Sequence, residues 1–115
     1  MNYDLEERCA KLGEEVIVFC KLIKSNDIIR PLVGQLVRSA TSVGANYMEA
    51  NQASSKKDFK NKIRISQKEA NESKHWLRMI AIADQNNKEK CRKLWKEAHE
   101  LTLIFAKISK SCNKV

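Results

Sequence analysis

Apolar residues recur at helical spacing along almost the whole chain. The first stripe alternates steps of four and three residues and predicts a helix from about Asp4 to Lys24. Its members are Leu5, Cys9, Leu12, Val16, Cys20 and Ile23. Turn-forming residues follow at 25–27, and Pro31 suits the first turn of a second helix because its missing N–H costs nothing there. The pattern predicts two helices joined by a short polar turn.

The second stripe has small residues in its middle. It consists of Leu32, Val33, Leu36, Val37, Ala40, Val43, Gly44, Tyr47 and Ala50. A glycine inside a helix costs up to about 1 kcal/mol relative to alanine. Gly44 therefore predicts that a neighbouring helix packs closely at this point.

Two further helices are predicted in the second half of the chain. Ser55-Lys56-Lys57-Asp58 forms a capping box that starts the third helix, which should end near 84–87. The third stripe is Phe59, Ile63, Ser66, Ala70, Ser73, Leu77 and Ile80, and the fourth is Cys91, Leu94, Ala98, Leu101, Phe105, Ile108 and Cys112. We therefore predict an all-α, antiparallel up-down-up-down four-helix bundle that forms a single domain over 1–115. An extended coiled coil is the alternative, and the short turns argue against it.

Composition supports this fold class and sets the expected compartment. The 115 residues include three Gly and one Pro, which favours long helices. The four cysteines are too far apart for a CxxC pair, so we expect free thiols that act as small hydrophobic groups in a reducing cytosol. The acidic start is unlike a signal peptide, and the apolar run 16–20 is too short for a membrane span. We expect a soluble cytoplasmic protein with no membrane contact.

The positive charge is unevenly distributed along the chain. The net charge is +8, yet residues 1–24 carry five acids and four bases, and residues 25–52 carry two of each. Residues 53–85 carry eight bases and four acids, and residues 86–115 carry eight and three. A phosphate-binding surface would explain this polarity, whereas lysines that only solvate the surface would not require it.

A helical projection of the third helix separates two unlike flanks. The basic flank holds Lys56, Lys57, Lys60, Arg64, Lys68, Lys74 and Arg78, and the other holds Asp58, Ile65, Glu69, Glu72, Trp76 and Met79. Lys62 departs from the pattern. The apolar side chains of the second flank indicate either a wide intramolecular seam or a subunit contact, and we favour an oligomer interface of Ile65, Glu69, Glu72, Trp76 and Met79. Arg38 is a candidate ion-pair partner for the two glutamates.

The fourth helix extends the basic surface. Its outer face gathers Arg92, Lys93, Lys96, Lys107, Lys110 and Lys114, interrupted by Glu89 and Glu100. Lysines supply point charges with little base-edge geometry, so the predicted contacts are sequence-independent. The expected nucleic-acid-binding residues are Lys56, Lys57, Lys60, Arg64, Lys68, Arg92 and Lys96.

Motifs for catalysis and metal binding are weak. Glu72 and His75 form an E-x-x-H, but a di-iron bundle needs two such motifs, and the other histidine, His99, has Lys96 in place of the glutamate. An S-x-x-K begins at Ser54 without the partner motifs of acyl transfer. We expect no catalytic residues, no metal site, no cofactor and no enzymatic activity.

Several segments resemble a known bacterial family. They are Gln35-Leu36-Val37-Arg38-Ser39-Ala40-Thr41-Ser42-Val43-Gly44-Ala45-Asn46-Tyr47-Met48-Glu49-Ala50, Ser54-Ser55-Lys56-Lys57-Asp58-Phe59, Lys68-Glu69-Ala70 through Trp76-Leu77, Asp4-Leu5-Glu6-Glu7-Arg8 and Val16-Ile17-Val18-Phe19-Cys20. Together they are similar to the four-helix-bundle proteins encoded in 23S rRNA intervening sequences. Ser66 departs mildly, since relatives tend to carry a small apolar residue there. The resemblance implies a ring, with a pentamer expected, and no established enzymatic activity.

The accessory proteins of diversity-generating retroelements are distantly similar, and they form basic pentameric barrels that engage nucleic acid and a reverse transcriptase. The first functional hypothesis is therefore a homo-oligomer that binds structured RNA or another nucleic acid. The alternative is a protein-interaction scaffold for a polymerase or a mobile-element product. Stoichiometric metal in the purified protein would support the third possibility, a metalloenzyme.

Overall fold

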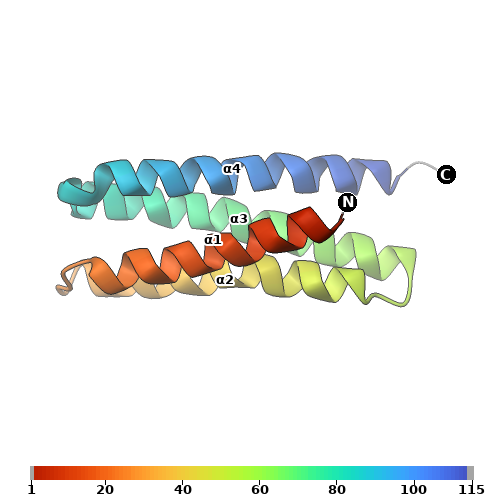
Figure 1. Cartoon of the computed structure of the whole chain (residues 1–115), viewed down its shortest axis with the longest axis horizontal. Coiled ribbons are helices and arrows are strands. Elements are labelled where there is room, and N and C mark those ends of the chain that lie inside the picture. The colour runs from red at the N-terminus through yellow and green to blue at the C-terminus, as the bar shows by residue number, and fades with distance from the viewer. Residues whose placement is uncertain (1, 114–115) are drawn as a thin grey trace.

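Four helices and one short 3-10 turn make up the fold. The computed structural model describes residues 2–113, with side chains described from residue 4 onward. The elements are α1 (Asn2–Leu22), α2 (Ile29–Asn51), α3 (Lys56–Ala83), the 3-10 turn η1 (Gln85–Asn87) and α4 (Lys88–Ser111). Successive helices run in opposite directions, and α1 is inclined to the other three in the view of Figure 1. The predicted all-α four-helix bundle is confirmed, with overall dimensions of 49 × 21 × 19 Å.

Side chains of the preceding turns cap the starts of α2 and α3. The hydroxyl of Ser55 accepts a hydrogen bond from the backbone N–H of Asp58 at 3.0 Å, so α3 starts as the capping box predicts. Pro31 lies in the first turn of α2, as the sequence predicts. The side-chain oxygen of Asn26 accepts from the backbone N–H groups of Ile28 and Ile29 at 2.9 and 2.8 Å, and the helix begins at Ile29, two residues before Pro31.

One hydrophobic core runs through the bundle and draws on all four helices. The predicted stripe of α3 is buried from Ile63 to Ile80, and Tyr47 of α2 packs against Phe105 of α4 with ring centroids 5.9 Å apart. In α1 the prediction needs correction, because Phe19 is buried and Cys20 is only half-buried. A step of three residues from Val16, rather than four, brings the larger apolar side chain into the core.

Buried hydroxyls lie where α2 and α3 pack together. Ser39 and Ser73 place their oxygens 2.9 Å apart, and the hydroxyl of Ser66 donates to the carbonyl of Val43 at 3.1 Å. All three serines are 0% exposed, and these hydrogen bonds satisfy their hydroxyl groups inside the protein. Small side chains at these positions allow the two helices to approach closely.

The cysteines are free thiols, two of them buried and two half-buried. Burial raises the pKa of Cys9 to about 12, and that of Cys20 and Cys91 to about 11. Thiols with such pKa values stay protonated at neutral pH and are poor nucleophiles. Among the described helices, none has the length and apolar character needed to cross a membrane.

Candidate nucleic-acid interface

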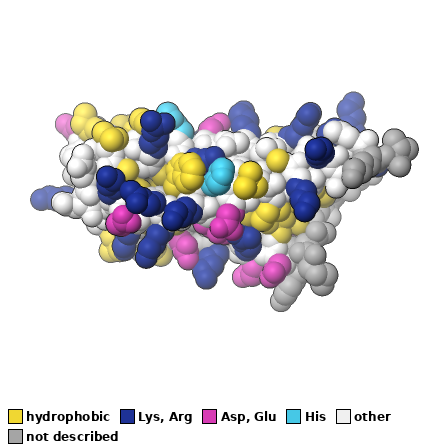
Figure 2. Space-filling view, turned by 90° about the horizontal axis from the view of Figure 1, so that it is seen from above, with side chains coloured by type: hydrophobic (Ala, Val, Ile, Leu, Met, Phe, Trp, Pro, Cys, Tyr) yellow, Lys and Arg dark blue, Asp and Glu magenta, His cyan; other side chains and the backbone are white. Residues whose placement is uncertain are grey.

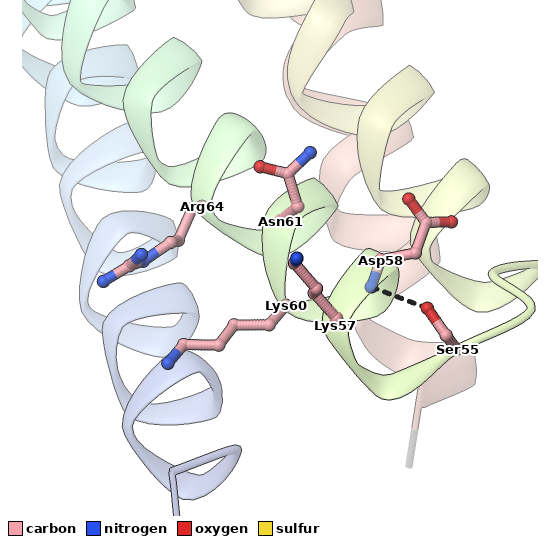
Figure 3. A pocket seen from close by; sticks show the side chains of 6 residues that line it. All are labelled: Ser55, Lys57, Asp58, Lys60, Asn61 and Arg64. Atoms are coloured by element: carbon pink, nitrogen blue, oxygen red, sulfur yellow. Dashed lines mark hydrogen bonds between the residues drawn. The ribbon is translucent and has the colours of Figure 1, made fainter.

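A basic hollow lies at the start of α3. It has a volume of about 480 Å³ and is lined by Ser55, Lys57, Asp58, Lys60, Asn61 and Arg64. Figure 3 shows Lys60 and Arg64 extending toward α4, while Ser55 and Asp58 lie beside the loop that enters the helix. Lys60 also hydrogen-bonds Asn113 beyond the end of α4. Three of the predicted phosphate-binding residues thus meet in one concave site.

The remaining predicted residues extend this surface along the bundle. Lys68 is exposed and lies with Arg64 at a shallow hollow in the middle of α3. Arg92 and Lys96 are exposed on the first half of α4, which runs beside the end of α3. Lys56 is exposed at the first position of α3, and Lys114, predicted on the same face, lies outside the described residues.

The seven predicted residues therefore form two groups rather than one cluster. From Arg64 to Arg78, which lies beside Arg92, the helix rises about 21 Å at 1.5 Å per residue. That length spans about six phosphates of one nucleic-acid strand at 3.4 Å each. Figure 2, seen from the α4 side, shows Lys and Arg side chains spread along the length of this face.

Acidic side chains of α3 and α4 are paired with arginines of the other two helices. Arg8 of α1 donates to Glu97 at 2.9 and 3.1 Å and to Glu100 at 2.9 Å. The hydrogen bonds to Glu97, opposed by desolvation and aided by Glu100, raise the pKa of Arg8 above its ordinary value. Glu100 was predicted to interrupt the basic face of α4, and the structure instead pairs it with α1.

Arg38 of α2 makes the equivalent pairing with α3. Its guanidinium donates to Glu69 at 3.0 and 3.3 Å and to Glu72 at 2.6 Å, which confirms the partner that the sequence suggested. Chiefly through the hydrogen bond to Glu69, this pairing raises the pKa of Arg38. Lys62, the residue that departed from the flank pattern, pairs with Glu49 of α2 at 2.7 Å.

The predicted oligomer interface lies on the α2 side of α3. Its five residues, Ile65, Glu69, Glu72, Trp76 and Met79, are all half-buried within the single chain. Trp76 packs against the core, and its buried indole N–H has no hydrogen-bond acceptor among the described residues. This flank contributes to an intramolecular seam, and its role between subunits stays a prediction.

The structure also places the residues that suggested other chemistry. His75 is exposed on α3 with its ring edge against Trp76. Within the described part of the chain, no group of three or more His, Cys, Asp or Glu side chains is arranged to hold a metal ion. Lys93, predicted on the basic face of α4, lines a groove against α1 together with Lys11 and Glu14.

Sequence reasoning missed an aromatic cluster between α3 and α4. Trp95 stacks on His99 with ring centroids 5.0 Å apart and an interplanar angle of 16°. Lys74 of α3 lies over the Trp95 ring, with its ammonium 4.8 Å from the ring centroid and 3.0 Å from Nδ1 of His99. The i, i+4 spacing of Trp95 and His99 was the available signal, because it places both rings on one face of the helix.

The fold and surface together define an all-α four-helix bundle whose excess positive charge lies on α3 and α4. The chain belongs to the 23S rRNA-intervening sequence protein family, which it matches over residues 2–107. It is also similar to a crystal structure of a protein of unknown function from the S23 ribosomal protein family of Bacteroides thetaiotaomicron. The TM-score is 0.81 at 28% sequence identity, covering 91% of this chain and 97% of that chain. No curated protein matches the chain.

Proposed function

We propose that this chain is a non-enzymatic basic homo-oligomer that binds structured RNA, or another nucleic acid, through phosphate contacts along α3 and α4. The observation that carries the proposal is the segregation of charge across the bundle. Glutamates of α3 and α4 pair with Arg8 and Arg38 of the other helices, while the predicted phosphate-binding residues lie outward or at the hollow of α3. The family's link to 23S rRNA intervening sequences supports RNA as the ligand.

The salt dependence of affinity tests the phosphate contacts. For a duplex ligand, the logarithm of the association constant should fall against log salt with a slope of about −0.9 per neutralised phosphate. The double variant Lys60→Gln/Arg64→Gln should flatten the slope by about 2, because two contacts are lost. The matched control, Lys21→Gln/Lys24→Gln, removes two exposed lysines near the end of α1 and should leave the slope unchanged. Absence of binding even at low salt would refute the proposal.

Self-association is the second part of the proposal, with five subunits as the number that the family resemblance implies. A groove of about 310 Å³ between α1 and α2 supports it, because small residues such as Gly13 and Ala45 form its walls. Ile17 and Met48 line the same groove and are 42% and 51% exposed. Such apolar side chains at a concave surface are suited to packing against a second copy.

Light scattering measures the subunit number directly. The wild-type chain should have a multiple of the 13.2 kDa monomer mass, and Ile17→Asp should lower it. Leu103→Asp, which introduces the same charge at an exposed position of α4, is the matched control and should not change the mass. A monomeric wild-type chain would refute self-association and leave the nucleic-acid proposal standing.

A protein-interaction scaffold is the second candidate function. It is favoured by Val18, Leu22 and Ile28, which are 59%, 69% and 68% exposed near the turn between α1 and α2. A pull-down from nuclease-treated cells separates the two candidates. A partner that is retained after nuclease treatment and lost with Leu22→Asp supports the scaffold, and loss of every partner on nuclease treatment counts against it.

A further inference from the structure

A hollow between the end of α3 and the start of α4 combines an apolar floor with cations. Its volume is about 310 Å³, and it is lined by Leu77, Arg78, Ala81, Lys88, Cys91, Arg92 and Trp95. Leu77 and Cys91 are 1% and 2% exposed, so they form a buried floor. Arg78, Lys88 and Arg92 are exposed around it. The volume lies at the low end of the range for small-molecule pockets, which suits a single ring system.

Trp95 is held in place before any ligand arrives. His99 stacks on the indole, and Lys74 lies over the indole from α3 while its ammonium contacts His99. Contacts from two helices restrict the rotamer of the indole, so little side-chain entropy remains to be lost when a ligand stacks on it. A flat, half-buried aromatic ring beside cations is the combination that single-strand-binding proteins use for bases and their phosphates.

Two acidic side chains lie near the hollow and weaken its positive potential only in part. Glu89 is one turn from Arg92, with a closest N···O separation of 3.7 Å. Asp84 accepts a hydrogen bond from Asn87 at 2.7 Å in the turn that precedes α4. Arg78 and Lys88 remain as additional cations at the rim, so an anionic ligand is favoured there.

Resting on the proposed function of the α3 and α4 surface, we propose that this hollow takes one unpaired nucleotide of a single-stranded nucleic-acid segment. The base stacks against Trp95 above the apolar floor, and the neighbouring phosphates contact Arg78 and Arg92. In a duplex both faces of each base are already stacked, so a paired base cannot reach the indole. The hollow therefore gives a preference for loops, bulges and ends over continuous duplex.

The test compares a labelled oligouridylate with a blunt duplex of equal length by fluorescence anisotropy. Trp95→Leu keeps an apolar side chain but removes the flat ring, and it should weaken oligouridylate binding about tenfold while duplex binding is unchanged. Leu103→Ala on the same helix is the control and should affect neither ligand. Equal affinities of wild type and Trp95→Leu for the single strand would overturn the inference.

A second variant guards against a folding defect at Trp95. Arg78 is exposed, so Arg78→Gln leaves the core intact. This variant should weaken the binding of the single strand more than the binding of the duplex. An equal effect of Arg78→Gln on both ligands would contradict the inference.

Intrinsic fluorescence reports the stacking itself. The chain has two tryptophans, so in Trp76→Phe the remaining emission comes from Trp95. Oligouridylate should quench this emission, and binding without quenching would overturn the inference.

Uridine monophosphate should compete only at concentrations far above those of the oligonucleotide, and equal potency would show that a free nucleotide is the ligand. If neither oligonucleotide binds, the proposed function fails with the inference, whereas duplex binding without a single-strand preference refutes the inference alone.

Discussion

Replacing Gly44 by alanine tests how closely α1 and α2 approach. Glycine inside a helix suggested that a neighbouring backbone lies close, and the structure confirms that Cys9 of α1 faces this position. A Cβ atom added at Gly44 would lie 3.6 Å from the backbone carbon, the carbonyl oxygen and the Cβ of Cys9. These are ordinary van der Waals separations, so an alanine methyl group fits without displacing α1.

The expected change in stability follows from two contributions of the same sign. Alanine in place of a helical glycine stabilises by about 0.5–1 kcal/mol through backbone entropy. Three new carbon and oxygen contacts add about 0.1–0.2 kcal/mol each. Gly44→Ala should therefore raise the free energy of unfolding by about 1 kcal/mol, which corresponds to a rise in Tm of about 4 °C.

Gly34→Ala is the matched control in the same helix. A Cβ added at Gly34 meets no atom within 4 Å, so Gly34→Ala should show only the stabilisation that comes from the higher helix propensity of alanine. Urea unfolding followed by circular dichroism measures both variants. If Gly34→Ala stabilises the protein and Gly44→Ala destabilises it, α1 and α2 are packed more closely than the structure shows, and the reasoning is refuted.

Two further predictions concern ionisable groups. Arg8→Gln leaves two glutamates of α4 unpaired, so it should lower the free energy of unfolding by about 1 kcal/mol at low salt and by less at high salt. Arg30→Gln breaks a more exposed ion pair and should leave the free energy of unfolding almost unchanged. Urea unfolding measures both variants. Burial raises the pKa of the Cys9 thiol from 9.0 to about 12 and that of the Cys91 thiol from 9.0 to about 11. Above pH 9 these two thiols therefore lose their protons in the unfolded chain and keep them in the folded chain. Stability under reducing conditions should therefore fall from about pH 9 upward, with a shallower fall in Cys9→Ala, and identical slopes would contradict the assignment.

Helical periodicity and capping chemistry were sufficient to predict most of the fold. The α3 stripe and its Ser55 cap were predicted correctly because both depend on local spacing. The start of α2 was also predicted correctly, because Asn26 lies in the predicted turn and cap segment and Pro31 lies in the first turn of the helix. In α1 the apolar pattern after Val16 allows a step of three residues to Phe19 or of four residues to Cys20. The sequence alone does not distinguish the two, and in the folded protein it is Phe19 that is buried.

The candidate site was less predictable because it depends on contacts between helices. The projection of α3 predicted the pairing of Glu69 and Glu72 with Arg38, although Asp58, placed on the same flank, lies in the basic hollow. It could not show that Lys60 and Arg64 share that hollow while Arg92 lies at the other end of the helix pair. The cluster around Trp95 requires Lys74 from a different helix, and no pattern within α4 contains that information.

The bundle increases the positive potential of its own α3 and α4 surface. In the sequence, the acidic residues of these two helices lower the net positive charge that their lysines and arginines supply. In the folded protein Arg8 and Arg38 neutralise four of those acids from α1 and α2, which leaves the outward cations of α3 and α4 with fewer opposing charges. In the proposed function, α1 and α2 therefore support phosphate binding by α3 and α4 without contacting phosphate themselves. It follows that Arg38→Gln should weaken RNA binding, because it leaves Glu69 and Glu72 without their cation partner, and that the effect should diminish as salt screens the two carboxylates.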